Sequence, residues 1–528
     1  MAKNPTGMKQ PATKARRLVK TTQNGRVQPK WTVMIYLVGD NDLSEESVWS
    51  LLEVFRAGTS DEIDVVVQID PRAKGIKLFE VGRLLEELAK RRSRDNVHRE
   101  ILSVGRPLGG KESMASIDTL TTFVSKTKEH HTADNYLLIL SGHAGGPVGK
   151  SFLIDQFPAG GLSLKDVSSA IEAAGGVDVL GMDSCGMGMV EVGQEFHKSG
   201  VEYLVASEGF ELNTGWPYFE IIDWLKKNPL TTPRALADTI VKIHTGYYSN
   251  YLMSGVSTDM AACEIALVPK LTTAIKQLAQ EMTRNLLLRQ KYSHDKDSVR
   301  DDRVFVEDLP LAHRSITDAI ILAHWRAQSY RFERHTDLYD FCDLLKRGCE
   351  DKGIQSACDD VMSVIKGKKR NGTNKRNSTN NGYVITSCHS GGAFQHSHGV
   401  AIYFPWAVVE DEYSELELSR KTGWDLFLRA YVRRTRRRAR EESRNVQIIA
   451  GLAGNSIDIK DFPELGTKDF PELGTKDFPE LSTKDFPELG TKDFPELGTR
   501  DFPELGTKGK LLVPVMKNPP DIFFSDPC

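Results

Sequence analysis

The chain has 528 residues, of which 40% are hydrophobic and 27% charged, and its 69 basic and 72 acidic side chains give a net charge of −3. This composition is typical of a soluble globular protein, and the near-neutral charge argues against a dedicated nucleic-acid-binding protein. No apolar run approaches the roughly 18 residues of a membrane span, so no membrane partner is expected. The seven cysteines form no CxxC pair and are too few for a disulfide framework, which argues against a zinc site or a disulfide-stapled fold.

The first 30 residues differ from the rest of the chain. Residues 1–30 carry eight Lys or Arg, no Asp or Glu, and few apolar side chains. Such a segment cannot bury enough apolar surface to offset the entropy lost on ordering, so we predict a basic disordered tail. No apolar stretch of the kind found in secretory signals follows it, which predicts a cytoplasmic protein.

From residue 31 onward, β-branched apolar runs alternate with amphipathic segments, a pattern typical of a parallel sheet flanked by helices. Strands are predicted at 32–38, 63–69, 136–140, 177–181 and 203–206. Helices are predicted at 45–55, 117–128, 164–174 and 188–196. The sequence therefore predicts a doubly wound α/β core over residues 31–230. Ligands bind such sheets at the carboxyl ends of the strands, which directs attention to three loops. These loops are 141–149, 182–188 and 207–216.

The pattern after this core is more helical. We predict an accessory helical region and the C-terminal part of the fold over 231–440, including a mobile loop at 367–381 that has almost no apolar residue. A linker (441–460) leads to six near-identical copies of DFPELGTK (461–508) and a C-terminal tail (509–528). Proline at every eighth position excludes a continuous helix or a central strand, and such repeats are usually disordered. The sequence does not identify a partner for them.

Two residues at predicted strand ends could carry chemistry. His143 follows the apolar run YLLIL and precedes two glycines, and Cys185 lies between a predicted strand and a predicted helix. The positive end of a helix dipole lowers the pKa of a nearby thiol and favours the thiolate. Either residue alone is more often structural. Because both fall at the same sheet edge, they could cooperate in acyl transfer, which indicates a cysteine peptidase.

Several motifs occur in an order and spacing shared with one peptidase family. They are WTVMIYLVGDNDLS, LLILSGHAGG, LSLKDVSSAI, VDVLGMDSCGMGMVEV, VASEGFELNTGWPY, HTDLYDFCDLL and GVAIYFP. The chain thereby resembles the clostripain-like cysteine peptidases of the caspase, gingipain and separase clan. The resemblance implies a caspase-like α/β sandwich with a mostly parallel central sheet. It also implies a Cys/His dyad and cleavage of protein or peptide substrates after Arg or Lys.

The resemblance also assigns roles to particular residues. It makes His143 the general acid/base and Cys185 the nucleophile, with the backbone N–H groups of Ala144 and Cys185 holding the oxyanion. Asp183 matches an acid that pairs with a basic P1 side chain, although an Asp at this point could instead cap a strand or helix end. Glu208 and Glu211 are candidates for the other wall of the P1 pocket, and the sequence does not decide between them.

Cofactors and processing follow from the same resemblance. No cofactor is expected to be required. The chain shows no loop with densely spaced oxygen ligands of the kind that binds calcium. Because some family members nevertheless depend on calcium, calcium dependence stays open. Related enzymes are commonly matured by internal cleavage. Lys150 follows the flexible GGPVG, whereas Lys165 lies in a predicted helix, so we predict an activating cut between Lys150 and Ser151. The loop 367–381 is a further expected cleavage site.

Two other readings of the sequence remain. AGGPVGKS, at 144–151, resembles a phosphate-binding loop and would indicate a nucleotide-binding protein. That motif needs a helix at its Lys-Ser pair, and the nearby Pro158 argues against a long helix there. The chain could also be a catalytically inactive scaffold, although the presence of both His143 and Cys185 argues against this.

Overall fold

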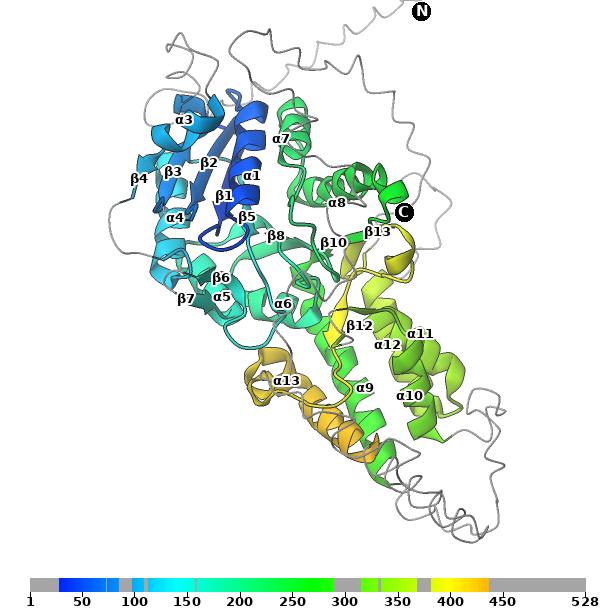
Figure 1. Cartoon of the computed structure of the whole chain (residues 1–528). Coiled ribbons are helices and arrows are strands. Elements are labelled where there is room, and N and C mark those ends of the chain that lie inside the picture. Colours follow the sequence, from blue (N-terminus) through cyan, green and yellow to red (C-terminus); the bar gives the residue numbers. More distant parts are fainter. Residues whose placement is uncertain are drawn as a thin grey trace, which may run out of the picture.

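The computed structural model describes residues 28–72, 74–84, 97–108, 113–156, 159–288, 315–330, 334–367 and 381–435 (Figure 1). Nearly all of the predicted basic tail lies outside the described residues. So do almost all of the predicted loop at 367–381, the linker, the octapeptide repeats and the C-terminal tail.

A nine-stranded sheet forms the centre of the fold (Figure 1). In spatial order its strands are β13 (Val384–Ser390), β10 (Thr258–Glu264), β9 (Val201–Ala206), β8 (Val177–Asp183), β5 (Asn135–Ser141), β1 (Trp31–Leu37), β2 (Ile63–Ile69), β3 (Lys77–Glu80) and β4 (Arg106–Pro107). The five strands from β9 to β2 pair in parallel, and antiparallel strands extend the sheet at both edges. The predicted α/β class with a mostly parallel sheet is therefore confirmed.

Two small sheets complete the strands. A hairpin pairs β6 (Phe152–Gln156) with β7 (Ala159–Leu162), and a three-stranded sheet contains β11 (Ser329–Tyr330), β12 (His335–Asp337) and β14 (Ala401–Tyr403). The α-helices are α1 (Ser44–Ala57), α3 (Val97–Val104), α4 (Ile117–His130), α5 (Leu164–Ala173), α6 (Val190–Glu195), α7 (Tyr218–Lys227), α8 (Pro233–Ser249), α9 (Val268–Leu288), α10 (Ile316–Arg326), α11 (Leu338–Gly348), α12 (Lys352–Lys366) and α13 (Glu417–Thr422), with further helical residues at 81–84 and 424–435. Short 3₁₀ turns lie at Phe196–Lys198, Leu252–Ser254, Ile265–Leu267, Gly392–Phe394 and Asp411–Glu415.

The alternation of side chains along each strand creates a core on each face of the sheet. In β1, Val33 and Ile35 belong to the core under α1, α7 and α8. Met34 and Tyr36 belong to the core under α4, α5 and α6. All seven residues of β1 are buried. A central strand covered on both faces therefore has a continuous apolar sequence, which is why the sequence pattern located it so well.

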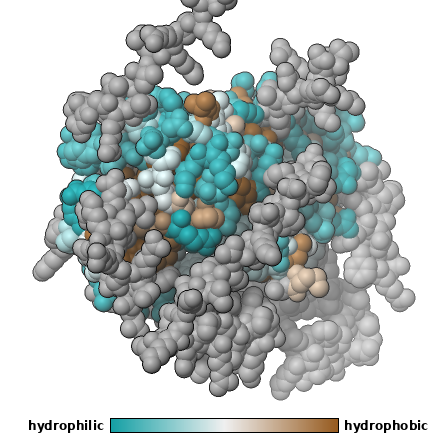
Figure 2. All heavy atoms as spheres, turned by 90° about the horizontal axis from the view of Figure 1, so that it is seen from above, coloured by the Kyte–Doolittle hydropathy of each residue, from teal (hydrophilic) through white to brown (hydrophobic). Residues whose placement is uncertain are grey.

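The region after residue 230 also contributes to the main sheet. Its β10 pairs antiparallel with β9, and β13 pairs with β10. The predicted helical character is found in α9, α10, α11 and α12, which lie together beyond one end of the sheet (Figure 1). Within the described residues, no helix combines the length and apolarity needed to cross a bilayer. Seen from above, hydrophilic side chains cover most of the described surface (Figure 2).

Candidate active site

The two predicted catalytic residues follow neighbouring parallel strands at the middle of the sheet. β5 and β8 pair with Ser141 opposite Asp183. His143 and Cys185 each come two residues after this pair, so both chain segments leave the same carboxyl edge of the sheet side by side. Both residues therefore follow paired strands at one edge of the sheet, as the sequence predicts.

The turn before His143 depends on a glycine. Gly142 has a φ of 152°, and a Cβ atom there would lie 3.2 Å from the Cβ of Val38. The Gly142 N–H donates to the carbonyl oxygen of Asp183 at 3.3 Å, and Ser184 Oγ donates to the Gly142 carbonyl at 2.7 Å. These bonds tie the histidine segment directly to the cysteine segment.

Cys185 is more accessible than the other cysteines described. Five of the described cysteines are not in a disulfide. Among them Cys185 is partly exposed and the other four are buried. The buried ones are Cys263, Cys342, Cys349 and Cys358. Because a nucleophile must reach its substrate, this difference in burial favours Cys185 over the others.

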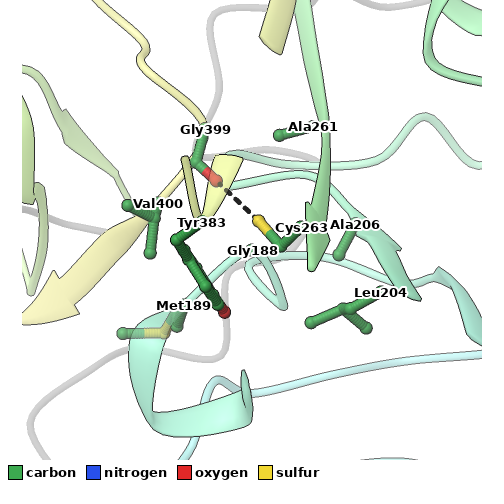
Figure 3. A pocket seen from close by; sticks show the side chains of 9 residues that line it. All are labelled: Gly188, Met189, Leu204, Ala206, Ala261, Cys263, Tyr383, Gly399 and Val400. Atoms are coloured by element: carbon green, nitrogen blue, oxygen red, sulfur yellow. Dashed lines mark hydrogen bonds between the residues drawn. The ribbon is translucent and has the colours of Figure 1, made fainter. Parts of the chain in front are cut away.

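The nearby Cys263 shows the opposite environment (Figure 3). It faces an enclosed apolar gap too small to admit a water molecule. This gap is lined by Gly188, Met189, Leu204, Ala206, Ala261, Cys263, Tyr383, Gly399 and Val400. Cys263 Sγ donates to the Gly399 carbonyl oxygen at 3.7 Å, and burial raises the pKa of the thiol. This gap is therefore part of the packing behind the nucleophile loop and holds a protonated thiol.

The helix after Cys185 begins later than predicted. The sequence predicts a start near Gly188, but α6 starts at Val190, five residues beyond the thiol, and has only six residues. Since the field of a helix dipole fades within its first turn, α6 contributes less to the Cys185 thiolate than the sequence suggested. The loop is positioned instead by backbone hydrogen bonds from Gly186 and Gly188 to the segment 207–209.

These backbone bonds require very close approach at one position. Gly188 N–H donates to the Ser207 carbonyl oxygen at 2.6 Å, and a Cβ atom on Gly188 would lie 2.8 Å from the backbone nitrogen of Glu208. A side chain at Gly188 would therefore push apart the two loops that surround Cys185.

His143 contacts a residue that the sequence analysis did not select. Its Nε2 lies 2.5 Å from Oδ1 of Asp42. Burial alone would raise the pKa of Asp42, but the hydrogen bond and charge of His143 outweigh this and hold the pKa below its usual value. Asp42 belongs to the motif GDNDLS after the first strand, and its position at another strand's carboxyl end was the available signal.

Asp183 is the last residue of β8, two positions before Cys185, and only 5% of its surface is exposed. Its Oδ2 accepts hydrogen bonds from Ser141 Oγ at 3.0 Å, Tyr218 Oη at 2.7 Å and Trp216 N–H at 3.3 Å. Burial, followed by the negative charge of Glu211, raises the pKa of Asp183 to about 6. The carboxyl group is thus fixed in place, and its environment disfavours the ionised form.

Glu211 and Glu208 occupy different surroundings. The carbonyl oxygen of Glu211 lies 3.8 Å from Cys185 Sγ, and its carboxyl Oε2 lies 3.1 Å from His244 Nε2. Its Oε1, like the Oε1 of Glu208, is buried and has no hydrogen-bond partner among the described residues. Glu208 is fully buried and accepts a hydrogen bond from the Gly399 N–H, and burial and the charge of Asp337 raise its pKa. Of the two candidates, Glu211 lies nearer to the nucleophile, and its charge acts on Asp183.

The loop after His143 contains the predicted processing site. Lys150 is exposed, and Ser151 Oγ donates to the carbonyl oxygens of Gly146 and Val148. Ala144 is partly exposed and forms a β-bridge with Phe152. Phe152 begins strand β6, so the Lys-Ser pair precedes a strand where a phosphate-binding loop needs a helix. The nucleotide-binding reading is therefore wrong.

Calcium was left open by the sequence. Among the described residues, no group of three or more His, Cys, Asp or Glu side chains has an arrangement suited to a metal ion. Calcium dependence therefore stays an open prediction from the sequence.

Comparison with known proteins identifies the family. The model of the clostripain family matches residues 35–428, which is most of the chain. The chain belongs to the clostripain family. It is 25% identical over 234 residues to clostripain from Hathewaya histolytica, and the match covers 39% of this chain and 44% of that protein. The chain thus matches less than half the length of this curated relative. The predicted family resemblance is confirmed.

Two solved structures of C11 proteases match this chain over most of its length. A secreted C11 cysteine protease from Bacteroides thetaiotaomicron, in complex with an irreversible peptide inhibitor, has a TM-score of 0.50 and 13% identity. An inactive zymogen C11 protease from Parabacteroides distasonis has a TM-score of 0.47 and 16% identity. Each similarity covers 75% of this chain and 99% of the other.

Proposed function

We propose that this clostripain-family protein is a cysteine endopeptidase that cleaves peptide and protein substrates after Arg or Lys. The observation that carries the proposal is the placement of Cys185 and His143 at adjacent strand ends above two buried acids. The thiol and imidazole supply the acyl-transfer chemistry. Asp183 and Glu211 supply the negative charge that a basic side chain would neutralise.

In the first half of the reaction, His143 takes the proton from the Cys185 thiol, and Sγ attacks the carbonyl carbon of the scissile peptide bond. The backbone N–H groups of Ala144 and Cys185 are proposed to hold the resulting oxyanion. When the tetrahedral intermediate collapses, the C–N bond breaks and the His143 imidazolium gives its proton to the leaving amine. A thioester on Cys185 remains.

In the second half, water attacks the thioester carbonyl while His143 accepts one of its protons. Collapse then breaks the C–S bond, releases the new carboxylic acid and returns the proton to sulfur. The site is restored without any co-reactant other than water.

The proposed P1 specificity rests on the charges of the Asp183 and Glu211 carboxylates. The proximity of Glu211 raises the pKa of Asp183, so these two acids repel each other when both are ionised. A guanidinium or ammonium group between them would relieve that repulsion and offer a donor to the unpartnered Oε1 of Glu211. A neutral P1 side chain would leave this repulsion unrelieved, which costs binding energy.

Self-processing is also part of the proposal. Lys150 is exposed on a short loop between β5 and β6, and its basic side chain matches the proposed P1 preference. Lys165 is less accessible to a protease, because it lies in the first turn of α5 and its helix begins with a capping box of Ser163 and Asp166. A cytoplasmic location stays a prediction from the sequence.

The proposal is tested by labelling and turnover together. A peptidyl chloromethyl ketone with Arg at P1 should alkylate Cys185, as located by peptide mass mapping. Cys185→Ala should neither be labelled nor cleave an Arg peptide, and His143→Ala should lose turnover. The exposure of Cys185 means that the fold should tolerate its replacement, which circular dichroism would confirm. Lack of both labelling and cleavage in the parent would support the inactive scaffold instead.

A further inference from the structure

The loop that follows β1 is held rigidly by a buried side chain. Asn41, which is 1% exposed, donates from Nδ2 to the carbonyl oxygen of Ile154 at 2.9 Å and accepts the Leu43 N–H on Oδ1 at 2.8 Å. Asp42 lies between these anchored positions. Its backbone therefore has little freedom, although its side chain is 72% exposed.

The base of the same loop is also anchored. Gly39 N–H donates to Oδ1 of Asp70 at 2.8 Å. Burial, and then the charge of Asp155, raise the pKa of Asp70 to about 8. The Asp70 bond at the base and the Asn41 bonds further along therefore anchor the segment that carries Asp42 on both sides.

The anchored loop presents the Asp42 carboxylate to His143. A carboxylate can only accept a hydrogen bond, so at 2.5 Å the proton between Asp42 Oδ1 and His143 Nε2 belongs to the imidazole. A neutral imidazole has one protonated and one unprotonated ring nitrogen. The bond to Asp42 therefore leaves Nδ1 unprotonated, so that it can accept a proton from Cys185.

We propose that Asp42 is a positioning residue for His143, so that the reaction depends on Cys185, His143 and Asp42 rather than on a dyad alone. This inference rests on the proposed peptidase function. Asp42 fixes the tautomer and the ring orientation of His143, and its negative charge favours the imidazolium that forms when the thiol ionises.

The exposure of Asp42 sets the expected size of the effect. Ion pairs in contact with water contribute little to folding, so loss of this one should leave stability nearly unchanged. Asp42 borders an open hollow of about 440 Å³, which lets water screen its charge. Most of its contribution should then come from orientation, which a neutral hydrogen-bond acceptor can also supply.

Kinetics of three variants separate these contributions. Asp42→Ala should lower kcat roughly tenfold and change KM less than about twofold, because the proposed role of Asp42 acts through His143 and not through substrate binding. Asp42→Asn should stay within about threefold of the parent kcat, because its carbonyl oxygen can accept the same bond. Glu45→Gln is the matched control, since Glu45 is an exposed acid beside the same hollow, and its kcat should not change. An unchanged kcat in Asp42→Ala would overturn the proposal.

A second measurement does not depend on turnover. In full-length protein carrying Cys185→Ala, ¹⁵N-labelled histidine reports which ring nitrogen of His143 bears the proton. Neutral His143 should be protonated at Nε2, and addition of Asp42→Ala should convert it to a mixture of both tautomers. The same tautomer population with and without Asp42 would refute the positioning role. If the parent neither cleaves nor reacts with the Arg electrophile, the peptidase function fails, while the tautomer result still decides the role of Asp42.

Discussion

Replacement of Asp183 by Asn should separate substrate recognition from folding. A pKa near 6 in place of 3.8 means that ionised Asp183 lowers the stability of the folded state by about 3 kcal/mol above pH 6. The folded state keeps this proton below about pH 6, whereas the unfolded state loses it above 3.8. Protonated Asp183 therefore contributes most to the stability of the folded state below pH 3.8, and this contribution is lost as the pH rises through 6.

Asn at position 183 carries no charge, and its carbonyl oxygen can still accept from Tyr218 and Trp216. We therefore expect the melting temperature of Asp183→Asn at pH 7.5 to equal or exceed that of the parent. Cleavage after Arg should nevertheless fall by roughly 100-fold in kcat/KM, which corresponds to about 2.7 kcal/mol, because a buried cation would lose one of its two acids.

The assay uses two peptides that differ only in P1, with Arg in one and its neutral isostere citrulline in the other. For the parent, kcat/KM on the Arg peptide should rise through about pH 6 as Asp183 ionises, since this ratio reports groups of the free enzyme. The Asp183→Asn variant should lack that rise and should discriminate poorly between the peptides. Undiminished cleavage of the Arg peptide by Asp183→Asn would show that Asp183 is structural and that Glu211 is the acid to replace next, followed by Glu208.

Two further predictions concern the loops around the site. Intact-mass analysis of the parent should reveal a fragment ending at Lys150 that is absent from Lys150→Gln. The control variant Lys165→Gln should be cut like the parent. Persistence of the fragment in Lys150→Gln would exclude self-cleavage at Lys150. Gly188→Ala should lower unfolding stability in urea by about 1–3 kcal/mol, because its Cβ would meet the Glu208 backbone nitrogen at 2.8 Å. Gly246→Ala is the control: this exposed position in α8 has no atom within 4 Å of a new Cβ and should gain up to about 1 kcal/mol. Equal stability of the two glycine variants would contradict the close approach at Gly188.

The central strands were predictable because their burial on both faces leaves an unbroken apolar sequence. The predicted strand at 63–69 agrees with β2, and the other parallel strands were located to within one or two residues at each end. β10 was missed because its sequence TDMAACE has one β-branched residue and two alanines, and alanine favours helices. Its pairing with β9 and β13 is a long-range contact that no local pattern encodes.

The candidate site was predictable only where a residue lies close in sequence to a strand end. His143 and Cys185 meet that condition, and each follows one of the paired strands β5 and β8. The partnership of His143 with Asp42 joins residues 101 positions apart, and the choice of Glu211 over Glu208 depends on which way each side chain turns. The late start of α6 was not foreseen, because the apolar spacing continues through Met189 and does not mark where the helix begins.

The order of strands in the sheet determines what a cut after Lys150 would produce. β1, β2 and β5 precede the cut, while β8, β9, β10 and β13 follow it, so the β5–β8 seam would become an interface between two polypeptides. That seam is buried in the middle of the sheet, with an apolar core on each face. The nicked protein should therefore behave as a two-chain particle that migrates as one species under native conditions and as two under denaturing conditions. His143 would reside on one chain and Cys185 on the other, which makes the association of the halves a requirement for catalysis.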